Sequence, residues 1–171
     1  MKSTKLASIK LLLLDVDGVL TDGGIIYQDD GSEIKQFNVK DGLGLRLLMD
    51  AEIQVGIVTG RRALALVHRC RNLGIKLIFD GITDKAAALY DILNQTGVTA
   101  DECAFVGDDL PDIGLMKRVG FSAAPADAHP HVRSVADLVT KAIGGNGAVR
   151  EVSEAILMAK GLWEQALKRF L

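Results

Sequence analysis

Residues 9–21, IKLLLLDVDGVLT, run from an apolar segment directly into an acidic one. The run Ile9–Leu14 has the length of a β-strand and is apolar almost throughout, which is typical of a parallel strand covered by helices on both faces. Asp15 and Asp17 follow where this strand should end. Because open α/β sheets bind ligands at the carboxyl ends of their strands, the stretch predicts a functional site at that edge.

The rest of the chain repeats this pattern of short apolar runs separated by amphipathic segments. Gly74, Gly97 and Gly120 stand where three of the helical segments should end, a common place for glycine. The alternation predicts a doubly wound, Rossmann-like α/β fold with a parallel sheet. Further strands are expected at Gln54–Val58, Lys76–Phe79, Cys103–Val106, Gly120–Ala123 and Asp137–Val139, and helices at Leu43–Ala51, Arg62–Leu73, Lys85–Thr96, Pro111–Val119 and Pro130–Ala136.

Two segments depart from the alternation. Residues 24–37, GIIYQDDGSEIKQF, contain Asp-Gly between alternating apolar residues and predict a β-hairpin. Its position after the acidic motif favours a functional flap, with a plain surface hairpin as the alternative. The tail, 144–171, begins with Gly-Gly-Asn-Gly, which predicts a flexible hinge, followed by a helix over Ala148–Ala166.

Length and composition exclude several classes of protein. The 171 residues, 49% hydrophobic and 25% charged, predict one globular domain over residues 1–171. A net charge of −2 gives no sign of nucleic-acid binding. The apolar run Leu11–Leu14 is too short for a membrane span. Cys70 and Cys103 lack metal-type spacing and are interpreted as reduced thiols, which favours the cytoplasm.

A second acidic cluster follows another apolar run, Cys103–Val106. It contains Asp108, Asp109 and Asp112. A single aspartate at a strand end is usually a helix cap or a turn residue. Two clusters after two separate strands would repel each other strongly without a cation, and hard carboxylate oxygens suit Mg²⁺. We therefore predict a magnesium site between them.

Two other strand ends carry groups suited to a phosphate. The run Gln54–Val58 leads into Thr59-Gly60-Arg61, and Lys85 opens a predicted helix after Asp84. A hydroxyl, backbone N–H groups, cations and a helix N-terminus together can hold an anion. Taken alone, Lys85 could equally be a solvated helix lysine.

In this order the residues resemble the four motifs of the haloacid dehalogenase superfamily of phosphatases. The motifs are DxDGxxT, a strand-terminal Thr, a Lys, and GDD followed by another Asp. The resemblance implies that Asp15 is the nucleophile, forms an aspartyl-phosphate and binds Mg²⁺. It also implies roles for six other residues: Asp17 as general acid–base and, through its carbonyl, metal ligand; Thr59 and Lys85 as phosphoryl-holding catalytic residues; Asp108 as metal ligand; and Asp109 and Asp112 as supporting residues.

The gaps between the motifs leave no room for the cap domain that many members of this superfamily insert. Residues 22–50 suffice for one hairpin and one helix, and residues 60–84 are also too few. We expect a fold of haloacid dehalogenase type without a cap, and a site that is open unless another subunit covers it. If a second subunit covers the open site, oligomerisation is needed for function, and we therefore expect a homo-oligomer.

Nearly the whole chain resembles one capless group, the family of 3-deoxy-D-manno-octulosonate 8-phosphate phosphatases. The segments concerned are DVDGVLTDGGIIY, FNVKDGLGLRLL, VTGRRALALVHRCRNLGI, FVGDDLPD, ADAHP and GGNGAVREV. The resemblance implies a sugar-acid phosphate as substrate, a place in lipopolysaccharide biosynthesis and a homotetramer whose tails approach neighbouring sites. It implies substrate contacts by Asp17, Asn38, Val39, Lys40, Asp41, Gly42, Arg46, Gly60, Arg61, Arg69 and Lys85.

Several alternatives stay open. Arg46 and Arg69 could be solvated surface residues, and Arg150 could form an ion pair with Glu151 or Glu154 instead of reaching a neighbouring site. The same chemistry could act on a nine-carbon, sialic-acid-type sugar 9-phosphate. A phosphomutase or a non-catalytic assembly module could share the fold, although such a module would not need Asp15, Asp17, Lys85 and Asp108 together.

Overall fold

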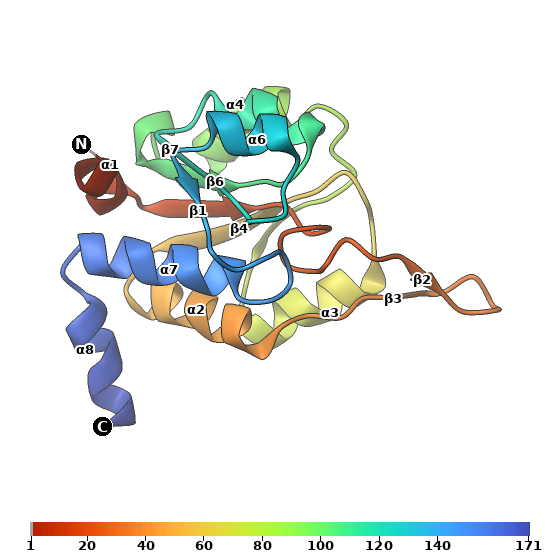
Figure 1. Cartoon of the computed structure of the whole chain (residues 1–171), viewed down its shortest axis with the longest axis horizontal. Coiled ribbons are helices and arrows are strands. Elements are labelled where there is room, and N and C mark those ends of the chain that lie inside the picture. The colour runs from red at the N-terminus through yellow and green to blue at the C-terminus, as the bar shows by residue number, and fades with distance from the viewer. Residues whose placement is uncertain (1) are drawn as a thin grey trace.

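The computed structural model describes residues 2–171 and contains a six-stranded, fully parallel sheet. Residue 1 of the predicted domain lies outside the described residues. The strand order is β5-β4-β1-β6-β7-β8 (Figure 1). The strands are β1 Leu11–Leu14, β4 Gln54–Val58, β5 Leu77–Phe79, β6 Cys103–Val106, β7 Phe121–Ala124 and β8 Leu138–Val139.

Strand β1 lies at the centre of the sheet, where the winding changes direction. It pairs with β4 on one side and with β6 on the other. All four leucines of β1 are fully buried. Because the connections leave this point on opposite sides, a crevice opens beyond its carboxyl end. The residues that follow β1, β4 and β6 therefore meet there.

Helices cover both faces of the sheet (Figure 1). Leu12 and Leu14 point into a core shared with one set of helices, whereas Leu11 and Leu13 point into the core on the other face. This alternation is the two-residue period of a strand. The first set is α2 Val39–Asp50, α3 Leu64–Leu73 and α7 Ala148–Ala159; the second is α4 Lys85–Thr96, α5 Ile113–Met116 and α6 Pro130–Val135. The predicted doubly wound α/β fold is confirmed.

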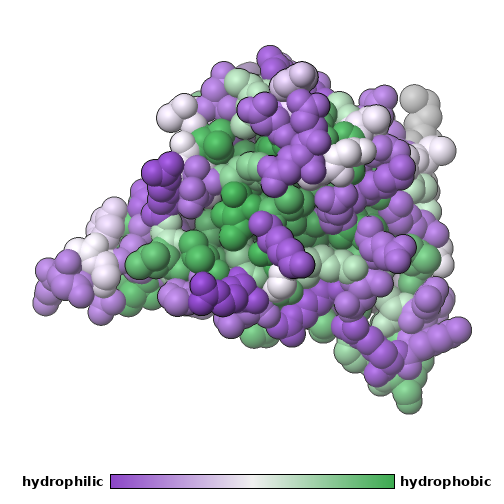
Figure 2. Space-filling model, turned by 180° about the vertical axis from the view of Figure 1, so that it is seen from behind, coloured by the Kyte–Doolittle hydropathy of each residue, from purple (hydrophilic) through white to green (hydrophobic). Residues whose placement is uncertain are grey.

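The predicted hairpin is present as β2 Ile26–Tyr27 paired with β3 Glu33–Ile34. It projects away from the sheet (Figure 1). Apolar surface is visible along this arm in the view from behind (Figure 2), and Ile25, Ile26 and Tyr27 are exposed. No cap domain is present in the part of the chain from residue 2 to residue 171, as the sequence predicts.

Several predicted boundaries are wrong. The tail helix is broken: α7 ends at Ala159, Gly161 has a φ of 70°, and the chain continues as α8 Trp163–Leu167 and the 3₁₀ turn η3 Lys168–Phe170. The helix expected over Pro111–Val119 is only η2 Leu110–Asp112 followed by α5. Helix α2 starts four residues early because Asn38 caps it, accepting a hydrogen bond from the N–H of Lys40. The elements α1 Lys2–Ser8 and η1 Ala100–Glu102 were not predicted.

The glycines ending the predicted helices have two different roles. Gly74 and Gly97 cap α3 and α4 with φ values of 85° and 70°, as predicted. Gly120 is no such cap: a Cβ there would lie 2.1 Å from the carbonyl oxygen of Asp101. Glycine at 120 therefore permits a close backbone approach between η1 and β7. None of the described helices has both the length and the apolar character needed to cross a membrane.

The prediction of a flexible hinge in the glycine-rich segment is also wrong. The N–H of Gly144 donates to Asp127, and the N–H of Gly145 donates to the carbonyl oxygen of Val19. A Cβ on Gly144 would lie 1.9 Å from the carbonyl oxygen of Gly18. These glycines let the segment pack directly against the loop that follows β1.

We expect Gly144→Ala to destabilise the protein by about 2–3 kcal/mol, because a backbone clash cannot be relieved by a rotamer change. Gly74→Ala is the control, since its Cβ would meet nothing within 4 Å and only the left-handed backbone is unfavourable. Urea denaturation of both variants measures the free energies of unfolding. Equal losses would show that the close approach at Gly144 is unimportant.

Candidate active site

The ends of β1, β4 and β6 surround one cavity of about 540 Å³. Asp15 follows β1, Thr59 follows β4, and Asp108 follows β6 by one residue. The cavity is lined by Asp15, Asp17, Gly23, Thr59, Gly60, Arg61, Ile82, Thr83, Lys85, Asp108, Asp109, Pro111 and Asp112. The structure thus brings together the residues of all four sequence motifs.

Lys85 bridges two of the aspartates. Its Nζ lies 2.9 Å from Asp15 Oδ1 and 2.6 Å from Asp112 Oδ1, and the side chain is 6% exposed. Asp84 caps α4 by accepting a hydrogen bond from the N–H of Ala87, which places Lys85 in the first turn. Burial lowers the pKa of Lys85, but the two carboxylates outweigh burial and leave the pKa above its ordinary value. Lys85 therefore keeps its charge inside the site.

Asp112 connects Lys85 to the backbone of the loop that follows β6. Its side chain is 1% exposed, and its Oδ2 accepts hydrogen bonds from the N–H groups of Asp108 at 2.9 Å and Asp109 at 3.2 Å. Its other oxygen binds Lys85. Asp109 caps η2 by accepting a hydrogen bond from the N–H of Leu110. Asp112 thus fixes both the loop after β6 and the ammonium group.

Three carboxylates of the site form a negative cluster that the single ammonium group of Lys85 does not balance. One oxygen each of Asp15, Asp108 and Asp112 lies within 4.8 Å of the others. Burial, and then Asp112, raises the pKa of Asp15 to about 6, although Lys85 lowers it. Burial, and then Asp15 and Asp112, raises the pKa of Asp108 to about 7. The site favours the arrival of a positive charge.

The donor set fits Mg²⁺. Asp108 Oδ1 is buried and has no hydrogen-bond partner among residues 2–171. Both oxygens of Asp112 are already engaged, Oδ1 by Lys85 and Oδ2 by the N–H groups of residues 108 and 109, whereas Lys85 contacts only Oδ1 of Asp15; Asp15 and Asp108 are therefore the carboxylates better placed to bind a metal. Mg²⁺ is usually held by one or two carboxylates, with water and phosphate completing its shell. Gly18 has a φ of 85°, and a Cβ there would lie 2.1 Å from Asp108 Oδ2, so glycine makes room for this carboxylate.

Asp108→Asn should therefore change stability in opposite ways with and without metal. In chelator, the raised pKa of Asp108 means that the wild-type protein loses stability as pH rises from about 4 to about 7. At pH 8 the asparagine variant should be more stable by about 1 kcal/mol, or roughly 2–4 °C in Tm. Added Mg²⁺ should raise the Tm of the wild-type protein and leave that of the variant unchanged. Scanning calorimetry at pH 8 decides this; an equal Mg²⁺ response in both proteins would contradict the assignment of Asp108.

Asp17 lies in a network of charges that the sequence did not reveal. Lys35, from the strand end of the hairpin, contacts Asp17 Oδ1 and lies 2.7 Å from Glu33 Oε1. Arg61 Nη2 binds Glu33 Oε2 at 2.7 Å, and its Nε lies 3.5 Å from Asp17 Oδ2. The hairpin therefore reaches the site of its own chain. Residues 33 and 35 are two apart in the segment predicted as the second hairpin strand, and the two-residue period of a strand would place them on one face; this was the signal available in the sequence.

The other predicted substrate residues lie outside the cavity lining. Asn38, Val39, Lys40, Asp41, Gly42 and Arg46 belong to α2 or its cap, and Arg69 belongs to α3. Arg69 donates to the carbonyl oxygen of Asn38 at 3.0 Å and lies over the ring of Phe37. Arg46 donates to the carbonyl oxygen of Asn72. A substrate contact by these residues stays a prediction.

Asp41 has a clear structural contact. It is 1% exposed and accepts hydrogen bonds from the N–H groups of Gly147 at 3.2 Å and Arg150 at 2.7 Å. Gly147 is the N-cap residue of α7 and Arg150 lies in its first turn, so the side chain of Asp41 caps that helix. Arg150 forms the predicted alternative ion pair with Glu154. Glu151 instead accepts hydrogen bonds from the N–H groups of Lys141 and Ala142.

Comparisons with known proteins agree with this geometry. Residues 75–152 match the family model of haloacid dehalogenase-like hydrolases. The 3-deoxy-D-manno-octulosonate 8-phosphate phosphatase of Escherichia coli K12 is 46% identical over 162 residues, covering 95% of this chain and 86% of that protein.

Two solved structures are also similar along nearly the whole chain. A 3-deoxy-D-manno-octulosonate 8-phosphate phosphatase from Moraxella catarrhalis, in complex with magnesium, phosphate and KDO, has a TM-score of 0.97 at 40% identity, covering 99% of this chain and 98% of that one. The enzyme of the same name from Yersinia pestis has a TM-score of 0.93 at 44% identity, covering 95% and 88%. The chain therefore belongs to the family of 3-deoxy-D-manno-octulosonate 8-phosphate phosphatases, which are phosphoric monoester hydrolases within the haloacid dehalogenase-like hydrolases.

Proposed function

We propose that this protein hydrolyses 3-deoxy-D-manno-octulosonate 8-phosphate to the free sugar acid and phosphate, with Mg²⁺ as cofactor and an aspartyl-phosphate intermediate. The observation that carries the proposal is the position of Lys85, 2.9 Å from Asp15, beside the unpartnered carboxylate of Asp108. The names of the relatives support the choice of substrate, and the Moraxella catarrhalis complex supports the choice of metal.

Asp15 is the proposed nucleophile. A carboxylate oxygen of Asp15 forms a bond to phosphorus while the bond from phosphorus to the sugar oxygen breaks. Both groups are anionic, so the site must offset their repulsion. Lys85 does so directly at Asp15, and Thr59, Gly60 and Arg61 line the same cavity. Asp15, Asp108 and the carbonyl of Asp17 would hold the Mg²⁺, which when bound supplies further positive charge at the phosphoryl oxygens.

Asp17 is the proposed general acid–base. Its carboxyl group lines the cavity two residues after Asp15. In the first step it donates a proton to the departing sugar oxygen, and in the second it takes a proton from the water that attacks the aspartyl-phosphate. A sugar alkoxide is a poor leaving group, so this proton is needed for a phosphomonoester. A carbon–halogen bond would not need it.

The substrate assignment is tested by comparing two sugar-acid phosphates. We expect the eight-carbon 8-phosphate to have the higher kcat/KM, with phosphate release abolished by chelator and restored by Mg²⁺. A nine-carbon sialic-acid-type 9-phosphate is the competing substrate, because the residues around the phosphate would serve both. A higher kcat/KM for the nine-carbon compound would overturn the substrate assignment and keep the phosphatase chemistry. Sugar isomerisation without phosphate release would indicate a phosphomutase.

The product makes a place in lipopolysaccharide biosynthesis the expected role. A homo-oligomer, expected to be a tetramer, is supported by the exposed apolar residues Ile25, Ile26, Tyr27 and Ile34 of the projecting hairpin. The two free, buried thiols of Cys70 and Cys103 support a location in the cytoplasm.

A further inference from the structure

We propose that Lys35 is a positioning residue for Asp17: its ammonium group holds Oδ1 and thereby fixes the orientation of the carboxyl group that exchanges the proton. The proposal rests on the proposed function, because it assigns the support of the general acid–base in that reaction. Its first basis is burial. The Lys35 side chain is 2% exposed, although it comes from a projecting hairpin whose strands are otherwise largely exposed.

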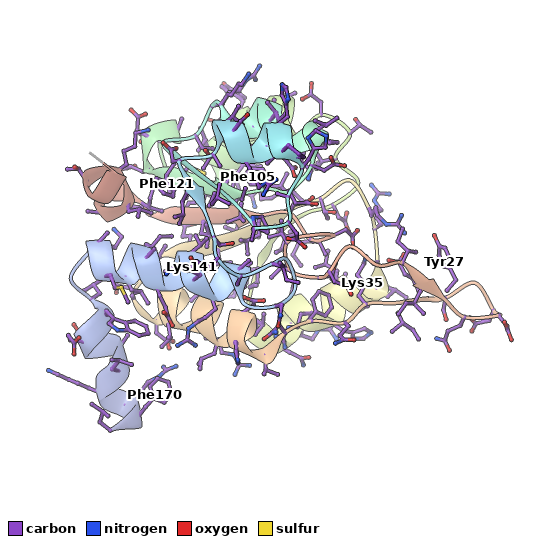
Figure 3. All side chains as sticks on the ribbon, viewed as in Figure 1. Tyr27, Lys35, Phe105, Phe121, Lys141 and Phe170 are labelled. Atoms are coloured by element: carbon purple, nitrogen blue, oxygen red, sulfur yellow. The ribbon has the colours of Figure 1, made fainter. Side chains whose placement is uncertain are left out.

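The contacts of Lys35 define what it does. Its Nζ touches Asp17 Oδ1 and Glu33 Oε1, so one ammonium group links the hairpin to the acidic loop. Burial lowers the pKa of Lys35, but its two carboxylate partners raise it above its ordinary value. Lys35 is therefore charged, and its ammonium group is held by the carboxylates of Asp17 and Glu33. Figure 3 shows it at the inner end of the hairpin, with Tyr27 farther out.

The two oxygens of Asp17 are not equivalent. Oδ1 is taken by Lys35, whereas the buried Oδ2 accepts no hydrogen bond from the described residues. Asp17 lines the cavity and Lys35 does not. Oδ2 is thus the oxygen without a hydrogen bond, with Arg61 Nε 3.5 Å away. In the proposed reaction this oxygen carries the proton that goes to the sugar oxygen as the phosphorus–oxygen bond breaks. The ammonium group at Oδ1 stabilises the carboxylate that remains after the transfer.

Arg61 is less suited to this role. Its Nε lies 3.5 Å from Asp17 Oδ2, and its side chain is 40% exposed. A half-exposed arginine at the cavity wall is better placed to meet a substrate group, and its Nη2 is bound to Glu33. Glu33 binds Lys35 through Oε1 and Arg61 through Oε2. Because Arg61 is more distant from Asp17 and more exposed, Lys35 is the group that fixes the carboxyl plane of Asp17.

The test compares leaving groups that need a proton with one that does not. Rapid mixing measures how fast the leaving group departs in the first turnover, which is the step that uses the general acid. The two substrates are 3-deoxy-D-manno-octulosonate 8-phosphate, which releases the sugar acid, and p-nitrophenyl phosphate, whose nitrophenolate leaves without protonation. Lys35→Met should slow the sugar phosphate about 10²-fold, the size of a general-acid contribution, and slow the nitrophenyl ester less than about threefold. Lys35→Arg should recover most of the lost rate.

Lys10→Met is the control, because Lys10 forms an ion pair with Glu102 at 2.6 Å far from the cavity and is 62% exposed. It should leave both rates unchanged. Equal losses for the two substrates in Lys35→Met would show a merely structural role and overturn the proposal, as would no loss. Turnover of the nitrophenyl ester by Lys35→Met shows that the variant is folded. If the wild-type enzyme turns over only other alkyl phosphates, the proposed substrate fails, and the same comparison is made with the alkyl phosphate that it does hydrolyse.

Discussion

Asp15→Asn is expected to lower the rate of phosphate release more than about 10⁴-fold, as removal of a nucleophile does in other enzymes. The amide fills the same space but cannot attack phosphorus. Steady-state assays with saturating Mg²⁺ measure this loss. In addition, acid quenching with substrate labelled in its phosphate should leave label on the wild-type protein and none on the variant, because an aspartyl-phosphate survives acid and noncovalent phosphate does not.

The fold of Asp15→Asn should survive. The substitution removes one carboxylate from a crowded negative cluster, in which burial raises the pKa of Asp15 to about 6, but it also weakens one of the two ion pairs of Lys85. We expect these effects to offset each other to within about 1 kcal/mol. Asp91→Asn, on the exposed face of α4, is the matched control and should keep full activity. Undiminished turnover in Asp15→Asn would eliminate the proposed mechanism.

The part of the site that follows sheet strands could be predicted from the sequence. Asp15, Thr59 and Asp108 each stand just beyond an apolar run, and parallel strands bring such positions to one edge. Their convergence needs no knowledge of side-chain packing. For Lys85 only the start of α4 could be predicted locally, because Asp84 is a standard helix cap; its place in the site followed from the family resemblance. At these positions the local signals for strand ends and helix starts agree with the topology of the sheet.

The residues that sequence analysis missed depend on contacts between distant segments. Lys35 looks like a solvated hairpin lysine until the hairpin is folded back on residue 17. Gly144 looks like part of a hinge until the loop after β1 is found against it. The tail helix gave a misleading pattern for another reason: its apolar spacing continues past Gly161, but the left-handed backbone there ends α7. The spacing of apolar residues gives no sign of a backbone break at a single glycine.

The buried position of Lys85 implies a large loss of stability on its removal. Lys85→Met keeps the length of the side chain but leaves Asp15 and Asp112 without their shared cation. Breaking a buried ion pair in this way typically costs about 3–5 kcal/mol, more than replacing both partners would. Urea denaturation in the presence of chelator should show this loss at pH 8. Phosphate release should also be lost, because Lys85 contacts Asp15, the proposed nucleophile.

The loss should depend on pH. In the wild-type protein Lys85 lowers the pKa of Asp15, so its removal moves that pKa above the present value of about 6. A carboxyl group whose pKa in the folded state is above its value in the unfolded state binds more protons when folded, and stability then falls as pH rises. Lys85→Met should therefore lose less stability at pH 5 than at pH 8. Lys10→Met, which breaks only an exposed ion pair, should change the free energy of unfolding by less than about 1 kcal/mol at either pH. A loss in Lys85→Met that is the same at both pH values would mean that the pKa of Asp15 does not respond to the missing ammonium group, and would contradict the electrostatic role assigned to Lys85.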